Sequence, residues 1–139
     1  MAYTRKTWQQ KLHNGHAAKV ERVDKRFADI PEGASMLVPT PEMVDAYIKN
    51  IPEGTQSTLA QMRKDLAAEN GVEYCCPITS GIFLRIAAEA AYEAHSGGKS
   101  ISEVTPFWRI LDRKSPAVNK VTFNKDFIRE QRATEGLPW

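Results

Sequence analysis

The spacing of apolar residues in the first half of the chain predicts two amphipathic helices. One covers Pro41–Ile51, where apolar side chains recur every three or four positions after Thr40, a favourable helix cap. The other begins after Thr58, which forms a capping-box pattern with Gln61. Its apolar stripe continues as far as Asn70-Gly71, a typical helix end.

The same periodicity predicts a longer third helix after Pro77, with Thr79 or Ser80 as its cap. It ends at Ser96-Gly97-Gly98, and its small inward residues permit close packing. The residues expected to face inward are Ile82, Phe83, Ile86, Ala87, Ala90 and Ala91. A short last helix is expected over residues 126–134.

Between these last two helices the pattern favours strands. Trp108–Leu111 and Val118–Phe123 flank a polar, breaker-rich turn, which predicts a short hairpin, or wing. The expected fold is therefore mainly α with a small β hairpin, a single domain of the winged helix-turn-helix type. We assign residues 37–139 to this domain and residues 1–36 to a basic N-terminal arm, partly disordered or extended.

Charge is distributed unevenly along the 139 residues, whose formal net charge is only +2. Residues 1–26 carry a net charge of +5 and residues 105–132 carry +4, whereas the helical stretch 41–104 carries −4. A polyanion would therefore contact the two ends of the chain.

The two cysteines, Cys75 and Cys76, are adjacent, so they offer neither zinc-ligand spacing nor an unstrained disulfide. They fit a reducing compartment, and we expect a cytoplasmic protein with no metal, no cofactor and no membrane partner. Both precede the third helix, whose N-terminus can lower a thiol pKa, so either could serve as an alkyl acceptor.

The segment Pro106-Phe107-Trp108-Arg109 resembles the active-site segment of the O6-alkylguanine-DNA alkyltransferases, which reads proline, cysteine, histidine, arginine. Further likenesses occur in the same order as in that family over residues 37–137. In addition, the start of the chain is similar to that of small bacterial proteins labelled as members of the alkyltransferase family. These are the segments 41–55, 57–62 and 80–83, the pair Glu135-Gly136, and the start Arg5-Lys6-Thr7-Trp8.

The resemblance implies a family scaffold without the family's chemistry. Alkyl transfer needs a thiolate, and the nucleophile position is occupied by Phe107, with Trp108 in place of the histidine. The nearest relatives are then the alkyltransferase-like proteins, which bind lesions without repairing them. The resemblance favours a protein that is not an enzyme and that binds double-stranded DNA, with O6-alkylguanine as the candidate lesion. It implies a lesion pocket formed from Phe107, Trp108 and Glu135.

In this interpretation the third helix enters the DNA groove and the hairpin tip contacts phosphates. The family's arginine that fills the base stack aligns with Ser80, and Arg85, one turn later, is its substitute. The expected DNA contacts are Thr58, Ser80, Arg85, Arg109, Arg113 and Lys114.

Simpler roles exist for several of these residues. Phe107 and Trp108 also fit a hydrophobic core, and Arg109 could pair internally with Glu135. A different function is open as well, because the acidic helical stretch, including Glu89 and Glu93, favours a winged-helix module that binds a protein partner.

Overall fold

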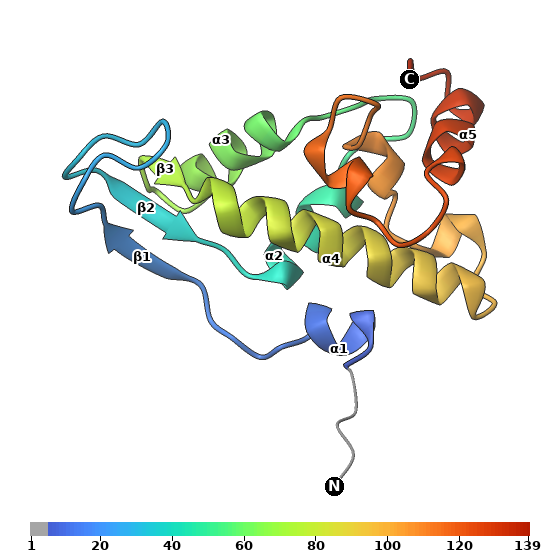
Figure 1. Ribbon diagram of the computed structural model, residues 1–139, viewed down its shortest axis with the longest axis horizontal. Helices are drawn as coiled ribbons and strands as arrows, with labels where there is room; N and C mark the ends of the chain where they lie inside the picture. The colour runs from blue at the N-terminus through green and yellow to red at the C-terminus, as the bar shows by residue number, and fades with distance from the viewer. Residues whose placement is uncertain (1–5) are drawn as a thin grey trace, which may run out of the picture.

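The computed structural model describes residues 6–139, and Arg5 of the shared start lies outside the described residues. The described part is mainly helical, with a small sheet at one end of a long central helix (Figure 1). The helices are α1 Trp8–Leu12, α2 Pro41–Lys49, α3 Leu59–Glu69, α4 Pro77–Ser96 and α5 Asp126–Thr134; the short 3-10 helices are η1 Ile101–Glu103, η2 Phe107–Arg109 and η3 Pro116–Asn119; the strands are β1 Lys19–Arg22, β2 Ser35–Val38 and β3 Tyr74–Cys75.

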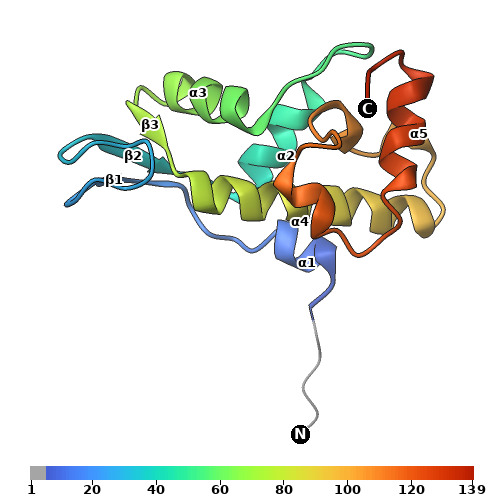
Figure 2. The same cartoon turned by 45° about the horizontal axis from the view of Figure 1, so that its top comes forward.

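Helix α4 crosses the molecule, and the other elements pack around it. Helices α2 and α3 lie on one side, α1 on the other, and α5 beside the C-terminal part of α4 (Figure 2). The small residues expected on its inner side, Ala87, Ala90 and Ala91, are almost completely buried. Their lack of bulk lets the neighbouring elements approach the α4 backbone closely.

The predicted caps of α2 and α3 are confirmed. The Thr40 hydroxyl accepts a hydrogen bond from the Met43 amide at 3.1 Å, and Thr58 accepts one from the Gln61 amide at 3.1 Å. The Gln61 side chain donates instead to Asp65 at 2.9 Å, so only half of the capping box forms.

The predicted cap of α4 is wrong. Thr79 and Ser80 lie inside the helix, which begins at Pro77 after an N-cap residue, Cys76, whose side chain makes no capping bond. Proline suits the first helical position because its φ is already helical and its missing N–H would have no partner there. The predicted end of the helix at Ser96 is confirmed.

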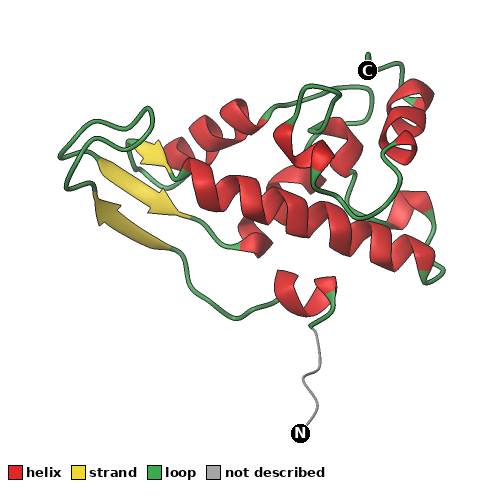
Figure 3. Cartoon of the chain, in the orientation of Figure 1, coloured by secondary structure: helices red, strands yellow, loops and turns green. Residues whose placement is uncertain are grey.

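The expected class, mainly α with a small β hairpin, is confirmed, but the hairpin lies elsewhere in the chain. Strand β1 pairs antiparallel with β2, with Lys19 opposite Val38, and β2 pairs parallel with β3. Residues 108–111 and 118–123 form no strands, and Figure 3 shows arrows only at the opposite end of the molecule. The described part of the expected arm, residues 6–36, contains α1 and β1.

Backbone carbonyls explain why residues 108–111 do not pair as a strand. The buried guanidinium of Arg132 donates to the carbonyls of Trp108 at 2.8 Å and Leu111 at 3.2 Å, and Ser57 donates to that of Arg109. With these acceptors occupied, the segment forms the 3-10 turn η2 instead of a ladder.

The main core lies between α2, α3, α4 and the segment 104–118. A smaller cluster around Ile30 joins the sheet to Cys76. Among the described residues, no helix combines the length and the apolar character needed to cross a membrane.

Candidate functional site

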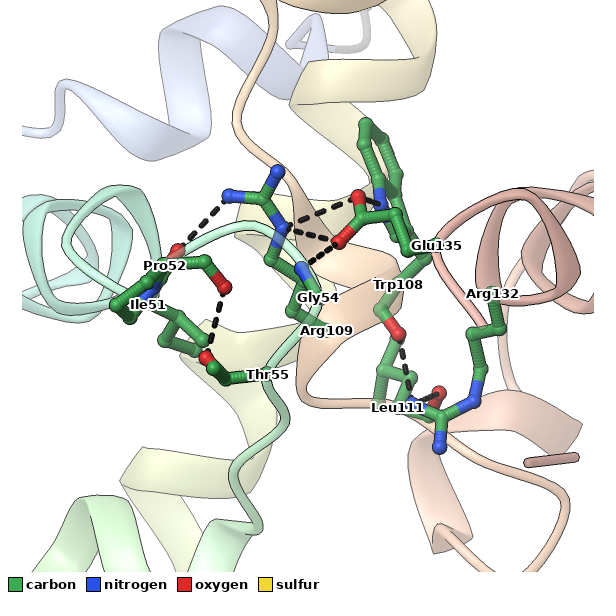
Figure 4. Close-up of polar contacts among 9 residues, drawn as sticks. All are labelled: Ile51, Pro52, Gly54, Thr55, Trp108, Arg109, Leu111, Arg132 and Glu135. Carbon is green, nitrogen blue, oxygen red and sulfur yellow. Dashed lines mark hydrogen bonds and ion pairs between the residues drawn. The ribbon is translucent and has the colours of Figure 1, made fainter. Parts of the chain in front are cut away.

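The Glu135 carboxylate links three segments that are distant in sequence (Figure 4). It accepts hydrogen bonds from Trp108 Nε1 at 2.5 Å, from Arg109 Nε at 2.9 Å and from the Gly54 amide at 2.8 Å. Burial would raise the pKa of Glu135, but these donors, with Arg109 the largest contributor, outweigh it and keep that pKa below its ordinary value. Glu135 is therefore ionised at neutral pH.

The expected lesion pocket is closed. Phe107 is 0% exposed and Trp108 is 2% exposed. The Phe107 ring packs against Phe123 and Phe127, with ring centroids 5.6 Å and 5.9 Å away, and Tyr92 stacks on Phe123. The cluster fills the space that a flipped base would need, so these rings act as core residues.

Arg109 and Ser80 are turned inward, contrary to the expected DNA contacts. The Arg109 side chain is 15% exposed, pairs with Glu135 and donates to the Ile51 carbonyl at 2.8 Å. Ser80 is fully buried, and its hydroxyl lies 3.2 Å from Cys75 Sγ. Neither side chain is exposed enough to contact a phosphate freely, because Ser80 is enclosed and Arg109 is largely buried in its ion pair with Glu135.

The cysteines do not form an accessible nucleophile. Cys75 and Cys76 are both buried free thiols. Burial raises the pKa of Cys75 and outweighs the opposing effect of the Ser80 hydroxyl. A raised pKa keeps the Cys75 thiol protonated at neutral pH, and burial keeps both sulfurs away from a DNA substrate, contrary to the alkyl-acceptor hypothesis.

A groove collects three other predicted residues: Thr58 from the start of α3, Arg85 from α4 and Lys114 from the segment before η3. The groove has a volume of about 680 Å³. Its floor and walls include Ile78 and Ile82, which are 56% and 51% exposed. These side chains stand one turn apart on α4, so they form an apolar strip next to the cations.

The cationic side of the groove comes from the segment that links η2 to α5. Lys114 and Lys120 are exposed and line the groove, whereas Asp112 is the acidic residue among its lining. Arg113 is also exposed but lies outside the lining, and its backbone amide donates to the Trp139 carbonyl at 3.2 Å.

A second cavity, also of about 680 Å³, lies between α2 and α3, and its chemistry is different. Tyr47 donates to Asp65 at 2.6 Å, and burial together with this bond raises the pKa of Tyr47 to about 12. Asp65 and Glu69 line this cavity, and among the described residues its lining contains no lysine or arginine. It is therefore unsuited to a polyanion.

The acidic residues expected to engage a protein partner serve the fold instead. Glu89 is 2% exposed and accepts hydrogen bonds from the amide and hydroxyl of Thr122 at 2.9 and 2.8 Å. Glu93 accepts from the backbone amides of Trp8 and Gln9. Both carboxylates therefore join segments of this chain to α4.

Sequence reasoning missed two features of the site. Arg132 is 1% exposed and connects η2 to Gln56 and to the Pro138 carbonyl, a role that no sequence signal indicates because arginine is usually exposed. The expectation that Ile82 faces inward is wrong: Ile78 and Ile82 lie four residues apart, on the side of the helix away from its buried alanines, and Ile82 is 51% exposed.

Within residues 6–139, no group of three or more His, Cys, Asp and Glu side chains is placed to hold a metal ion. Comparisons with family models, curated proteins and solved structures find no significant match to this chain. The functional argument therefore rests on the groove and on the residues that surround it.

Proposed function

We propose that this protein is a non-enzymatic DNA-binding protein of the alkyltransferase-like type, which contacts the duplex through the groove beside α4. The observation that carries the proposal is the gathering of Thr58, Arg85 and Lys114, three of the expected DNA contacts, in one groove. Lys120 adds a further cation there. The free, buried cysteines suit the reducing cytoplasm as its location.

The composition of the groove favours backbone contacts over reading of base edges. Lys114 and Lys120 can neutralise phosphates without demanding geometry. Ile78 and Ile82 have no hydrogen-bonding groups, so they suit the apolar walls of a minor groove, where such side chains are commonly inserted. We therefore expect weak sequence preference.

The proposal includes no chemical step and no stacking of a base on the buried aromatic pair. Phe107, at the family's nucleophile position, is enclosed by other rings and has no group that can accept an alkyl substituent. We expect affinities for plain and O6-methylguanine duplexes to agree within about threefold, since the closed cluster leaves no pocket for the alkylated base. A factor of three in affinity corresponds to a binding free-energy difference of less than about 1 kcal/mol.

The test is fluorescence anisotropy with labelled plain and O6-methylguanine duplexes between 50 and 200 mM salt. The plot of log affinity against log salt should fall by about 0.9 for each phosphate neutralised. The double variant Lys114→Ala/Lys120→Ala should flatten the slope by about 1.8. The matched control is Lys99→Ala, an exposed lysine beyond the opposite end of α4.

Each outcome has a clear meaning. Absence of binding at 50 mM salt, or a slope near zero, would refute the proposal. Binding that the double variant leaves unchanged would place the DNA elsewhere on the protein. A marked preference for the alkylated duplex would show that the aromatic cluster opens, contrary to the closed pocket.

A second candidate function, a module that binds a protein partner without the expected wing, is favoured by the exposure of Ile78 and Ile82. Scattered exposed apolar residues are common, but two adjacent ones in a groove mark an interaction surface. Binding to a protein through this strip should depend little on salt and should be lost in Ile78→Ser/Ile82→Ser. The salt series described above thus separates the two functions.

A further inference from the structure

Helix α1 is attached to α4 by several contacts besides the one that the indole ring of Trp8 makes with Arg85. The Trp8 and Gln9 amides donate to the Glu93 carboxylate at 3.1 and 3.3 Å, and the Gln9 side chain donates to the Ala90 carbonyl at 2.8 Å. Leu12 is 5% exposed and anchors the other end of the helix. The position of α1 is therefore fixed by its backbone, by Gln9 and by Leu12.

The indole ring of Trp8 contacts two cations. Lys11 Nζ lies 4.1 Å from the ring centroid, and Arg85 Cζ lies 5.3 Å from it. Cations over an indole face are attracted by its electron density, and tryptophan is the strongest of the aromatic partners. One ring thus orients a lysine of α1 and an arginine of α4.

Arg85 forms one long ion pair, with Glu89, within the described part of the chain. The distance from its Nη2 to Glu89 Oε2 is 3.8 Å, too long for a hydrogen bond, and Glu89 is already occupied by Thr122. Arg85 Nε is buried without a hydrogen-bond partner among residues 6–139. The side chain is 33% exposed and lines the groove, so its remaining donors can reach an external anion.

We propose that α1 is a second wall of the DNA-binding surface, and that Trp8 is the residue that positions Arg85 and Lys11 for phosphate contacts beyond those of Lys114 and Lys120. This inference rests on the proposed DNA-binding function. The elements that carry these cations are α1, α4 and the segment before α5, and α1 and that segment both lie against α4 (Figure 1).

The physical reason for a positioning role is entropic. Lysine and arginine side chains lose much rotamer freedom when they bind a phosphate, and a ring that already restricts them reduces that loss. Phenylalanine retains an aromatic face, whereas alanine removes it. The two substitutions of Trp8 therefore distinguish the face of the ring from the mere presence of a large side chain.

The experiment compares the wild-type chain with Trp8→Phe and Trp8→Ala in the salt series, after thermal melting has confirmed that each variant is folded. We expect Trp8→Phe to bind within about twofold of wild type. Trp8→Ala should bind about fivefold to tenfold more weakly at 50 mM salt. Its slope of log affinity against log salt should be shallower by about 1 to 2, because two phosphate contacts loosen.

Two further measurements keep the inference testable if Trp8→Ala does not fold. Lys11→Gln and Arg85→Gln, which leave the indole in place, should each flatten the slope by about 0.9. DNA should also quench tryptophan fluorescence in the wild type and in Trp139→Phe, the matched control, but much less in Trp8→Phe.

Where Trp8→Ala is folded, it can be combined with Lys11→Gln/Arg85→Gln. The combined variant should bind DNA little more weakly than Lys11→Gln/Arg85→Gln alone.

The outcomes separate this inference from the function on which it rests. A wild-type protein that does not bind DNA overturns both. A wild-type protein that binds DNA, with an unchanged slope in Lys11→Gln, Arg85→Gln and any folded Trp8→Ala variant, overturns only the role of α1. An equal loss from Trp8→Ala with and without the two cations also overturns it, because the ring would then act independently of them.

Discussion

Replacing Glu135 by glutamine tests whether the carboxylate network fixes the segment 105–111. The side chain of Glu135 is 7% exposed, and its two oxygens serve Trp108, Arg109 and Gly54. Glutamine has nearly the same shape, but one oxygen becomes an NH₂ group that faces donors, and the charge opposite Arg109 is lost. The substitution therefore removes electrostatics while it changes packing little.

The expected cost follows from the burial of the pair. Removing one partner of a buried ion pair destabilises a protein by about 3–5 kcal/mol. Arg109 keeps a hydrogen bond to Ile51 and is 15% exposed, so we expect a loss near the lower end, about 3 kcal/mol. With an unfolding entropy of about 2.1 cal/mol/K per residue, the 139 residues give a melting temperature lower by about 10 °C.

The free energy of unfolding is measured by urea titration and thermal melting followed by circular dichroism at pH 7. The matched control is Glu130→Gln, the same substitution at an exposed position of α5. It should change stability by no more than about 0.5 kcal/mol, as ordinary surface substitutions do. A loss of that size for Glu135→Gln as well would refute the structural role of the network.

The pH dependence gives an independent check. The pKa of Glu135 is lowered in the folded protein, so its contribution to stability is complete above the unfolded pKa and disappears as the pH falls through the folded pKa. The stability difference between wild type and Glu135→Gln should therefore be largest at pH 7 and begin to narrow near about pH 5. If the stability difference between wild type and Glu135→Gln instead widened as the pH fell, the pKa of Glu135 would not be lowered in the folded protein.

Three further predictions concern other parts of the fold. Cys75, whose pKa is raised by burial, should react with a thiol reagent at pH 7 only on unfolding, and mass spectrometry should detect no alkyl adduct after incubation with an O6-methylguanine duplex. Ala28 has a φ of 52°, so Ala28→Asn should raise the unfolding free energy by about 0.5 kcal/mol, whereas Gly33→Ala, at a φ of 86°, should lower it by about 1 kcal/mol. Arg132→Lys should lose about 2 kcal/mol or more in urea titration, because an ammonium cannot reproduce the planar set of donors that contacts Trp108, Leu111 and Pro138; a loss of less than about 0.5 kcal/mol would contradict this.

The helices could be predicted from the sequence because their signals are local. A threonine hydroxyl that caps α2 or α3 contacts an amide three residues away, and Gly97, after the end of α4, is adjacent to it in the sequence. The strands expected at 108–111 and 118–123 failed for the opposite reason. The backbone of residues 108–111 is held by Arg132, more than twenty residues from Trp108, and the amide of Thr122 donates to the distant Glu89. β propensity yields to such contacts.

The candidate site was predicted in part, and burial decides which part. Ser80 and Arg85 lie on the same helix, yet Ser80 faces Cys75 in the core and Arg85 lines the groove. The sequence alone assigned both to DNA, because which polar residues of a helix face outward depends on where its neighbours pack. The same reasoning separates Lys114 in the groove from Arg109 in the interior.

The contact between Trp108 and Glu135 bears on what kind of function this scaffold supports. The indole Nε1–H can donate a hydrogen bond but cannot accept a proton, and the carboxylate that receives it is also occupied by Arg109 and Gly54. Proton transfer requires a group that changes its partner during the reaction. Here the Trp108 indole, Arg109 Nε and the Gly54 amide all donate to the one carboxylate of Glu135, so the network joins η2, the end of α5 and the turn after α2 and stabilises their arrangement. A function for this protein is therefore better sought at the groove, where Arg85, Lys114 and Lys120 remain available to a ligand.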